Sequence, residues 1–247
     1  MHLYADYHTH TTYSHGTGSI KENIEVAIKK GLKEIAISDH GPASRSIVKL
    51  GVEDSATLLE IKREVDKYNR LYPEIKVLAG VEANIIGVDG RLDVPEFILK
   101  ELDKVLVGFH LFIKPVSFRD GIEIILNNVI VDKLRINHGE IRFKNTEILI
   151  NTLNNYDNID IITHPGYKVD IDTKTLAKVA VEKEVALEIN SSHGYMREEY
   201  IKVALEEGAK FTLGSDAHSP DKVGDVETAM LVAQHSGLTT KDIINVY

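Results

Sequence analysis

The stretch EIAISDH, residues 34–40, carries the pattern that decides the fold. Three apolar residues, Ile35–Ile37, lead directly into a polar end that contains Asp39 and His40. A short, continuous apolar run is typical of a parallel strand that is buried on both faces. The same pattern recurs in HLYADYH (2–8), IKVLAGVE (75–82), DKVLVGFH (103–110), NIDIITH (158–164), EVALEIN (184–190) and AKFTLGSD (209–216). We therefore predict seven parallel strands.

Helical patterns separate the predicted strands. The segment SIKENIEVAIKKG, residues 19–31, begins with a serine cap, has a glutamate three residues later and closes with glycine. Further helices are predicted over residues 55–72, 172–184, 197–208 and 223–237. Strands that alternate with helices indicate an α/β fold with a parallel sheet and the helices outside it. The first choice is a closed barrel of seven or eight units, and the second is an open, doubly wound sheet.

Residues 111–145, between the fourth and fifth predicted strands, break this alternation. They contain the runs IEIILNNVIV, in which isoleucine and valine predominate, and RINHGEIRF. We predict that this segment is an insertion, either a hairpin or a lid.

Composition excludes several classes of function. The chain of 247 residues has no cysteine, which excludes disulfides, thiol catalysis and cysteine-ligated zinc. Its net charge of −9 argues against a nucleic-acid partner. Residues 1–20 lack a long apolar run, and no stretch reaches the roughly 20 apolar residues of a membrane span. The expectation is a cytoplasmic protein with no membrane partner.

Polar side chains gather at the carboxyl end of every predicted strand. They are Asp6, His8, His10, His15, Asp39, His40, Glu82, His110, His164, Glu188, Asn190, Asp216 and His218. Because the carboxyl ends of parallel barrel strands open onto one face, we expect these residues to converge.

The spacing of His8 and His10 indicates a metal site. Two residues apart on an extended segment, their side chains point the same way, and two neutral imidazoles can share one divalent cation. Histidine combined with Asp or Glu suits Zn²⁺, Mn²⁺ or Fe²⁺. The seven histidines, with Glu82 and Asp216, exceed the needs of one tetrahedral ion, whereas three ions bridged by Glu82 would use them all. Such a centre supplies a metal-bound hydroxide near a pH of about 7 and holds phosphate oxygens.

Simpler interpretations apply to other polar residues. His2 is expected to be solvated, His235 to interact with the end of its helix, and His138 to lie in a turn or in the lid. Glu188 and Asn190 are interpreted as hydrogen-bonding groups at the sheet end. Asp6 and Asp39 are expected to orient ligands rather than to bind metal, with loop capping as the alternative for Asp39.

Seven motifs, taken together and in order, resemble those of the PHP (polymerase and histidinol phosphatase) superfamily, in particular its YcdX-like phosphoesterase branch. They are DYHTHTTYSHGTGS, AISDHGP, GVEANIIGVDGRLD, VGFH, ITHPG, ALEINSS and LGSDAHSP. The resemblance extends from Ala5 to about Gly224. It implies a single PHP domain over residues 1–247, folded as a distorted (βα)₇ TIM-like barrel, with three divalent ions, Zn²⁺ before Mn²⁺ or Fe²⁺.

The resemblance also implies a role for each matching residue. His8, His10, Glu82 and Asp216 would form the first metal site, Glu82, His110 and His164 the second, and His15, His40 and His218 the third. Catalysis would depend on Glu82, Asp216 and His218. His193 and Arg197, which follow the sixth strand, are candidates for binding a phosphate.

The function expected from these residues is metal-dependent hydrolysis of small phosphate monoesters. Three alternatives remain open. A histidinol-phosphate phosphatase is disfavoured by SDH (38–40), because dedicated members look like TEH there. A 3′–5′ exonuclease is disfavoured because the chain has a negative net charge, whereas proteins that bind nucleic acids need basic groups to neutralise the phosphates. A non-catalytic regulatory domain would be expected to lack ligands, and a purely structural barrel would bind no metal. Relatives in the family suggest a small homo-oligomer.

Overall fold

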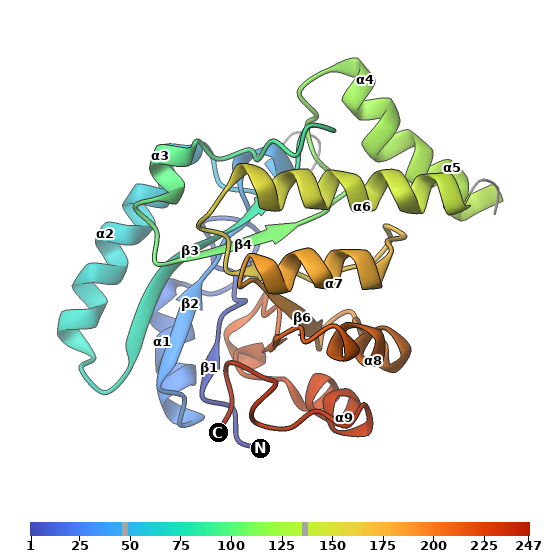
Figure 1. The fold of residues 1–247 in the computed structure, drawn as a ribbon. Helices are drawn as coiled ribbons and strands as arrows, with labels where there is room; N and C mark the ends of the chain where they lie inside the picture. The colour runs from blue at the N-terminus through green and yellow to red at the C-terminus, as the bar shows by residue number, and fades with distance from the viewer. Residues whose placement is uncertain (46–48, 135–137) are drawn as a thin grey trace.

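The computed structural model describes residues 1–45, 49–134 and 138–247. Within them, seven parallel strands form one sheet whose order in space is the order in sequence (Figure 1). The strands are β1 (Ala5–Asp6), β2 (Glu34–Ile37), β3 (Lys76–Asn84), β4 (Lys104–Gly108), β5 (Ile161–Ile162), β6 (Ala186–Asn190) and β7 (Phe211–Gly214). The seven predicted strands and the barrel-type α/β architecture are confirmed.

Helices cover the outside of the sheet (Figure 1). They include α1 (Ile20–Lys29), α2 (Ser55–Leu71), α3 (Glu96–Leu99), α7 (Thr173–Glu182), α8 (Glu198–Glu206) and α9 (Glu227–His235). The α1 helix begins with the predicted capping box, in which Ser19 and Glu22 each accept a hydrogen bond from the other's backbone N–H. In the described part of the chain, none of the helices combines the length and apolarity needed to cross a bilayer.

The last residues of the chain close the barrel between β1 and β7. We call residues 242–247 the seam, because they lie between these two strands. Val246 bridges Leu3, and Ile243 bridges Phe211. The buried Asn245 side chain accepts from the Leu213 N–H (2.9 Å) and donates to the carbonyl oxygens of Ala5 and Leu213 (both 2.8 Å). The first and last strands are thus joined through side-chain and backbone hydrogen bonds.

Alternate residues of each strand face opposite sides of the sheet, which sets the position of the site. Ile35 and Ile37 pack in the larger core beneath the helices, whereas Ala36 belongs to a second core inside the barrel. The interior core comprises Ala5, Tyr7, Ala36, Leu78, Leu106, Ile161 and Ala186. Residues two or four positions further along these strands must therefore also point inward, at the carboxyl end.

Residues 118–134 and 138–145 are helical, so the hairpin alternative is wrong for those residues, and residues 111–117 form an irregular connection. The helical residues form α4 (Phe118–Asp120), a π-helical turn (Gly121–Leu126), α5 (Asn127–Leu134) and the start of α6 (His138–Asn155), which pack beside one another (Figure 1). Residues 135–137, part of the second predicted hairpin strand, lie outside the described residues.

Tertiary contacts explain why a β-branched run became helix. Asn128 and Asn145 are both buried, and their side-chain amides exchange two hydrogen bonds of 2.8 and 3.1 Å between α5 and α6. Ile124 is fully buried, whereas Leu126 is 48% exposed, so one side of the segment packs and the other faces solvent. Packing of this kind overrides the local preference for strand.

Candidate metal centre

The inward positions of the strands bring the predicted ligands together at the carboxyl end of the barrel. Starting from interior core residues, steps of two lead from Ala36 to His40, from Leu78 to Glu82 and from Leu106 to His110. Gly108 lies in this row and leaves room for its neighbours. A Cβ there would come within 2.2 Å of the His110 ring and 2.8 Å of the Glu82 carboxylate.

Glu82 is fully buried at the middle of the cluster, and histidines approach both of its carboxylate oxygens. Its Oε2 lies 2.8 Å from His40 Nδ1 and 3.3 Å from His8 Nε2. Its Oε1 lies 3.1 Å from His164 Nε2 and 3.3 Å from His110 Nε2, and accepts a hydrogen bond from the Thr163 hydroxyl. A carboxylate with both oxygens engaged in this way has the arrangement expected of a bridging ligand.

Asp216 lies two residues beyond β7, and its carboxylate contacts a histidine that follows the first strand, β1. Its Oδ1 is 3.2 Å from His10 Nε2 and 3.4 Å from His218 Nδ1. Its Oδ2 is 3.1 Å from His193 Nε2. The backbone fixes this approach, because the His10 N–H donates to the Ala217 carbonyl at 2.8 Å.

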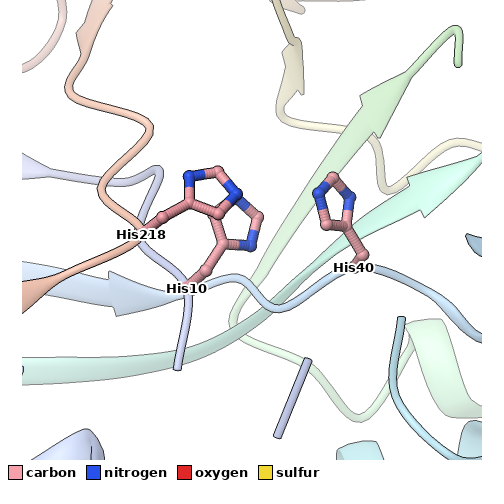
Figure 2. A group of neighbouring side chains, drawn as sticks. All are labelled: His10, His40 and His218. Atoms are coloured by element: carbon pink, nitrogen blue, oxygen red, sulfur yellow. The ribbon is translucent and has the colours of Figure 1, made fainter. Parts of the chain in front are cut away.

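His10, His40 and His218 face one another in Figure 2, with ring centroids of His10 4.5 Å from His40 and 4.3 Å from His218. His15 joins them, 4.1 Å from His218 and 5.0 Å from His40. Three groups have ligand atoms within 4.8 Å of one another: His10, His40 and His218; His8, His10 and Glu82; and His40, Glu82 and His110. His40 therefore lies near Glu82 and His110 as well as near the residues of the third predicted site.

The donor atoms of this cluster fit divalent cations. His8 Nε2, both ring nitrogens of His10, His40 Nδ1 and Glu82 Oε2 are buried, and although some of them lie close together, none has the geometry of a hydrogen bond in the described structure. Leaving polar atoms buried in this way is costly unless a partner of another kind satisfies them. Imidazole nitrogens and carboxylate oxygens, without a thiolate, are a donor set that Zn²⁺, Mn²⁺ and Fe²⁺ accept.

Four histidines are held in the tautomer that a metal ligand needs. Each Nδ1–H donates to a fixed acceptor: His8 to Glu188 (2.6 Å), His110 to Asn84 Oδ1 (2.8 Å), His15 to the Leu50 carbonyl (2.9 Å) and His218 to the Asp216 carbonyl (2.9 Å). In a neutral ring, a proton on Nδ1 leaves Nε2 with a free lone pair that a metal ion can bind. Such outer hydrogen bonds fix the ring orientation of metal-binding histidines.

Burial and neighbouring charges separate the protonation states of the cluster. Burial, together with the nearby His40, lowers the pKa of His10 well below its usual value and the pKa of His15 to about 4. Burial alone would raise the pKa of Glu82, but the surrounding histidines hold it well below its ordinary range. The pKa of His8 is raised, since the Glu188 and Glu82 carboxylates outweigh its burial. Charged carboxylates thus sit among imidazoles, of which His10 and His15 are neutral.

Asp39 and Asp6 are buried outside the cluster and support the loops that carry it. Asp39 accepts hydrogen bonds from the Thr11 N–H (2.7 Å) and hydroxyl (2.6 Å) and from the Ser14 hydroxyl (2.5 Å). These contacts correspond to the loop-capping alternative. Asp6 accepts from the Ser215 hydroxyl (2.5 Å) and the Gly224 N–H (2.7 Å), and so ties the first strand to the last.

Glu188 is a hydrogen-bonding group at the sheet end, as expected, and its partners are two predicted ligands; Asn84 and Asp93, which were not predicted as site residues, also support the cluster. Glu188 contacts His8 and also accepts the His164 N–H at 2.8 Å. Asp93 accepts from the Asn84 amide at 2.6 Å, which orients the amide oxygen toward His110. Strand alternation was the available signal, because Asn84 follows Glu82 by two residues and Glu188 follows Ala186 by two.

The remaining candidates lie farther out. His193 lines the cavity over the cluster, whereas Arg197 is outside that lining, with its guanidinium 5.8 Å from the Tyr195 ring. His2 lies beside Tyr247, and His235 is exposed in the last turn of α9. The side chain of His138 is outside the described part.

Comparison with known proteins decides the family. Residues 6–192 match the model of the PHP domain, and this span includes seven of the nine predicted ligands. The chain belongs to the PHP domain family. The remaining two predicted ligands are Asp216 and His218, which follow β7 and lie beyond the matched residues. The Asp216 carboxylate contacts both His10 and His218.

Curated relatives of this PHP-family chain include two kinds of protein. A protein named probable phosphatase from Thermoanaerobacter sp. (strain X514) is 34% identical over 259 residues, which cover 99% of this chain and 91% of the relative. The DNA polymerase/3′-5′ exonuclease PolX of Bacillus subtilis is 29% identical over 97% of this chain, but over only 38% of its own length.

A solved structure has the same fold. The histidinol phosphate phosphatase from Lactococcus lactis, crystallised with zinc, L-histidinol and phosphate, superimposes with a TM-score of 0.64 at 16% identity. The superposition covers 96% of this chain and 95% of that one. This likeness supports the PHP-type distorted barrel.

Proposed function

We propose that this PHP-family protein is a metal-dependent phosphatase that hydrolyses small phosphate monoesters. The observation that carries the proposal is the convergence of buried imidazole and carboxylate atoms that lack hydrogen-bond partners at the carboxyl end of the barrel. The family and the phosphatase names of full-length relatives support the same conclusion. An acidic protein with a cavity of about 290 Å³ over the cluster suits a small ester better than a polymer.

The proposal places three divalent ions, with Zn²⁺ as the first choice, on nine side chains. The sites are those implied by the sequence: His8, His10, Glu82 and Asp216; Glu82, His110 and His164; and His15, His40 and His218. The two engaged oxygens of Glu82 support its role as the bridge. When bound, the ions would supply a hydroxide nucleophile at neutral pH and neutralise the charge of the phosphate.

The chain's own groups position the reaction. Glu82 and Asp216 keep the donor atoms of separate strands at fixed distances, so that little reorganisation is needed when substrate binds. His193 lines the cavity, and its Nε2 contacts the Asp216 carboxylate. We propose that the His193 ring lies beside the phosphate of the bound substrate. Arg197 lies outside the cavity lining, so its predicted contact with phosphate would need a different side-chain position.

Residues 111–145 are proposed as an insertion that borders the entrance to the site. Leu111 and Phe112 line the cavity directly, and the helices that follow them extend from the same side of the barrel (Figure 1). A segment in this position would select substrates by the shape of the entrance.

The proposal is tested by metal analysis and by a panel of substrates. Purified protein should contain zinc, manganese or iron; treatment with a chelator should abolish hydrolysis of p-nitrophenyl phosphate, and addition of one of these metals should restore it. The variant Glu82→Gln should bind less metal and lose at least about a hundredfold in kcat/KM, because it removes a charge that two sites share. Glu60→Gln, at an exposed position on α2, is the matched control.

Exonuclease activity is the second candidate, since the 29% identity to PolX spans nearly the whole chain. The same panel therefore includes single-stranded DNA and histidinol phosphate. Faster turnover of DNA than of any monoester would replace the phosphatase proposal. Metal binding without hydrolysis of any compound would favour a regulatory domain.

A further inference from the structure

The cavity over the cluster changes in character from its floor to its rim. Predicted ligands such as Glu82 and Asp216 form the floor and are 0% and 4% exposed. At the rim, Phe112 is 62% exposed and Lys168 is also exposed. Because the phosphate of a bound ester must reach the buried floor, its leaving group must face the rim.

Most of the wall outside the ligands is apolar. Leu50, Phe109, Leu111 and Phe112 line the cavity beside the histidines. A wall of this kind binds a carbon skeleton by burying it from water. The leaving group that fits here therefore has an apolar part next to the ester bond.

Lys168 is the one lysine or arginine among the described residues that line this cavity. Its ammonium lies 4.7 Å from the centroid of the Tyr167 ring, which stacks on the His193 ring at 4.1 Å. His193 in turn contacts Asp216 through its Nε2. This series of contacts holds the positive charge at the rim, while the metal ligands occupy the floor.

The ammonium of Lys168 has no carboxylate partner within the described residues, whereas Lys100, Lys104 and Lys202 each pair with an acid. The chain as a whole carries a net charge of −9. Among the described residues that line the entrance, Lys168 is the one lysine or arginine, and a cation there in an otherwise acidic protein attracts an anionic group from the ligand.

We propose that Lys168 binds a second anionic group of the substrate, so that the preferred substrates are small phosphate monoesters whose leaving group carries an apolar skeleton and a carboxylate or phosphate. This inference rests on the proposed phosphatase function. The position of Lys168 at the exposed rim, away from the buried donor atoms, favours a contact with the leaving group over a contact with the reacting phosphate.

The test compares two substrates that differ in one charge, phenyl phosphate and 4-carboxyphenyl phosphate, in the wild type and in Lys168→Met. Methionine keeps the length of the stem and removes the charge. We expect the variant to lose at least about tenfold more in kcat/KM on the carboxylated ester than on phenyl phosphate, as for a lost charged hydrogen bond. Differences in the reactivity of the two esters cancel in this double comparison. A third ester, 4-phosphonophenyl phosphate, shows whether a phosphonate replaces the carboxylate.

A binding experiment separates this inference from the proposed function. Calorimetry of the zinc-loaded wild type and of Lys168→Met with benzylphosphonate and 4-carboxybenzylphosphonate needs no turnover. A preference for the carboxylated compound that disappears in the variant supports the role of Lys168, even if no ester is hydrolysed, in which case the phosphatase proposal alone fails. Equal losses on both members of each pair, or no loss on either, would overturn the inference. Lys178→Met, at an exposed position on α7, should match the wild type throughout.

Discussion

Glu188 shows how a buried residue outside the predicted ligand set can control the cluster. Its carboxylate accepts from His8 Nδ1 at 2.6 Å and from the His164 N–H at 2.8 Å, and so it orients two candidate ligands from different strands. A carboxylate in this position holds the imidazole tautomer and increases its basicity.

We predict that Glu188→Gln lowers metal affinity by about 10- to 100-fold, because the charge behind His8 is lost and the new amide N–H₂ group faces a backbone donor. Titration of the metal-free protein with Zn²⁺ measures the change. Glu182→Gln, at an exposed position on α7, should bind zinc as the wild type does. Unchanged affinity in Glu188→Gln would mean that His8 keeps its orientation without this carboxylate.

At the residue scale, the sequence predicted which side chains would meet, although it did not predict all of their contacts. His8, His40, His110 and Asp216 follow strands, and parallel strands must present their carboxyl ends together. The role of Glu188 depends on how β6 is placed beside the segment after β1, and this register is a property of the closed sheet. The position of Arg197 outside the cavity lining depends on the loop after β6, for which spacing gives no guide.

At the scale of elements, Gly90 shows how closely a turn is packed against a helix. Gly90 has φ +82°, and a Cβ added there would lie 2.4 Å from the backbone nitrogen of Thr152 in α6. Gly31 provides a matched comparison, since it has φ +81° and no atom within 4 Å of an added Cβ. The two positions separate the cost of backbone strain from the cost of a steric clash.

We expect Gly31→Ala to reduce the free energy of unfolding by about 1 kcal/mol, which is the cost of a left-handed backbone. Gly90→Ala should cost a further ~1–3 kcal/mol, because α6 must move away from the turn. Urea denaturation of both variants measures the difference. Equal effects would show that α6 yields to the added methyl group without loss of packing.

Element prediction succeeded where local and tertiary preferences agree. The strands have continuous apolar runs, and helices such as α1 have both caps and an apolar face, so the two levels indicate the same structure. Between β4 and β5, the local preference of the sequence and the tertiary contacts indicate different structures. The run of isoleucine and valine favours strand, but contacts such as the Asn128–Asn145 pair exist only once α5 and α6 have formed as helices.

At the scale of the whole molecule, the seam holds both the barrel and the candidate metal centre. Asn245 joins Ala5 and Leu213 below the site, and above it His10 and Asp216 lie 3.2 Å apart across the same boundary. Divalent ions bound to both residues would add a second connection between the first and last strands. Metal binding and barrel closure should therefore support each other.

We predict that Asn245→Ala lowers the free energy of unfolding of the metal-free protein by about 2–3 kcal/mol, because it leaves buried backbone groups of Ala5 and Leu213 without partners. Thermal unfolding, recorded with and without added Zn²⁺, measures the loss and the extent to which metal restores it. Asn154→Ala, at an exposed position on α6, is the control. A variant that unfolds at the wild-type temperature without metal would show that the backbone bridges alone close the barrel.

The seam also governs when the protein can finish folding as it is synthesised. Neighbouring strands follow one another in the chain, so each new strand can join the one before it as it leaves the ribosome. The amide of Asn245, by contrast, bonds a carbonyl 240 positions earlier, and this contact has one of the longest loops in the chain to close. Until that late segment emerges, the nascent sheet retains two open edges at which other chains can add, so a pause in translation near residue 240 would expose the protein to aggregation.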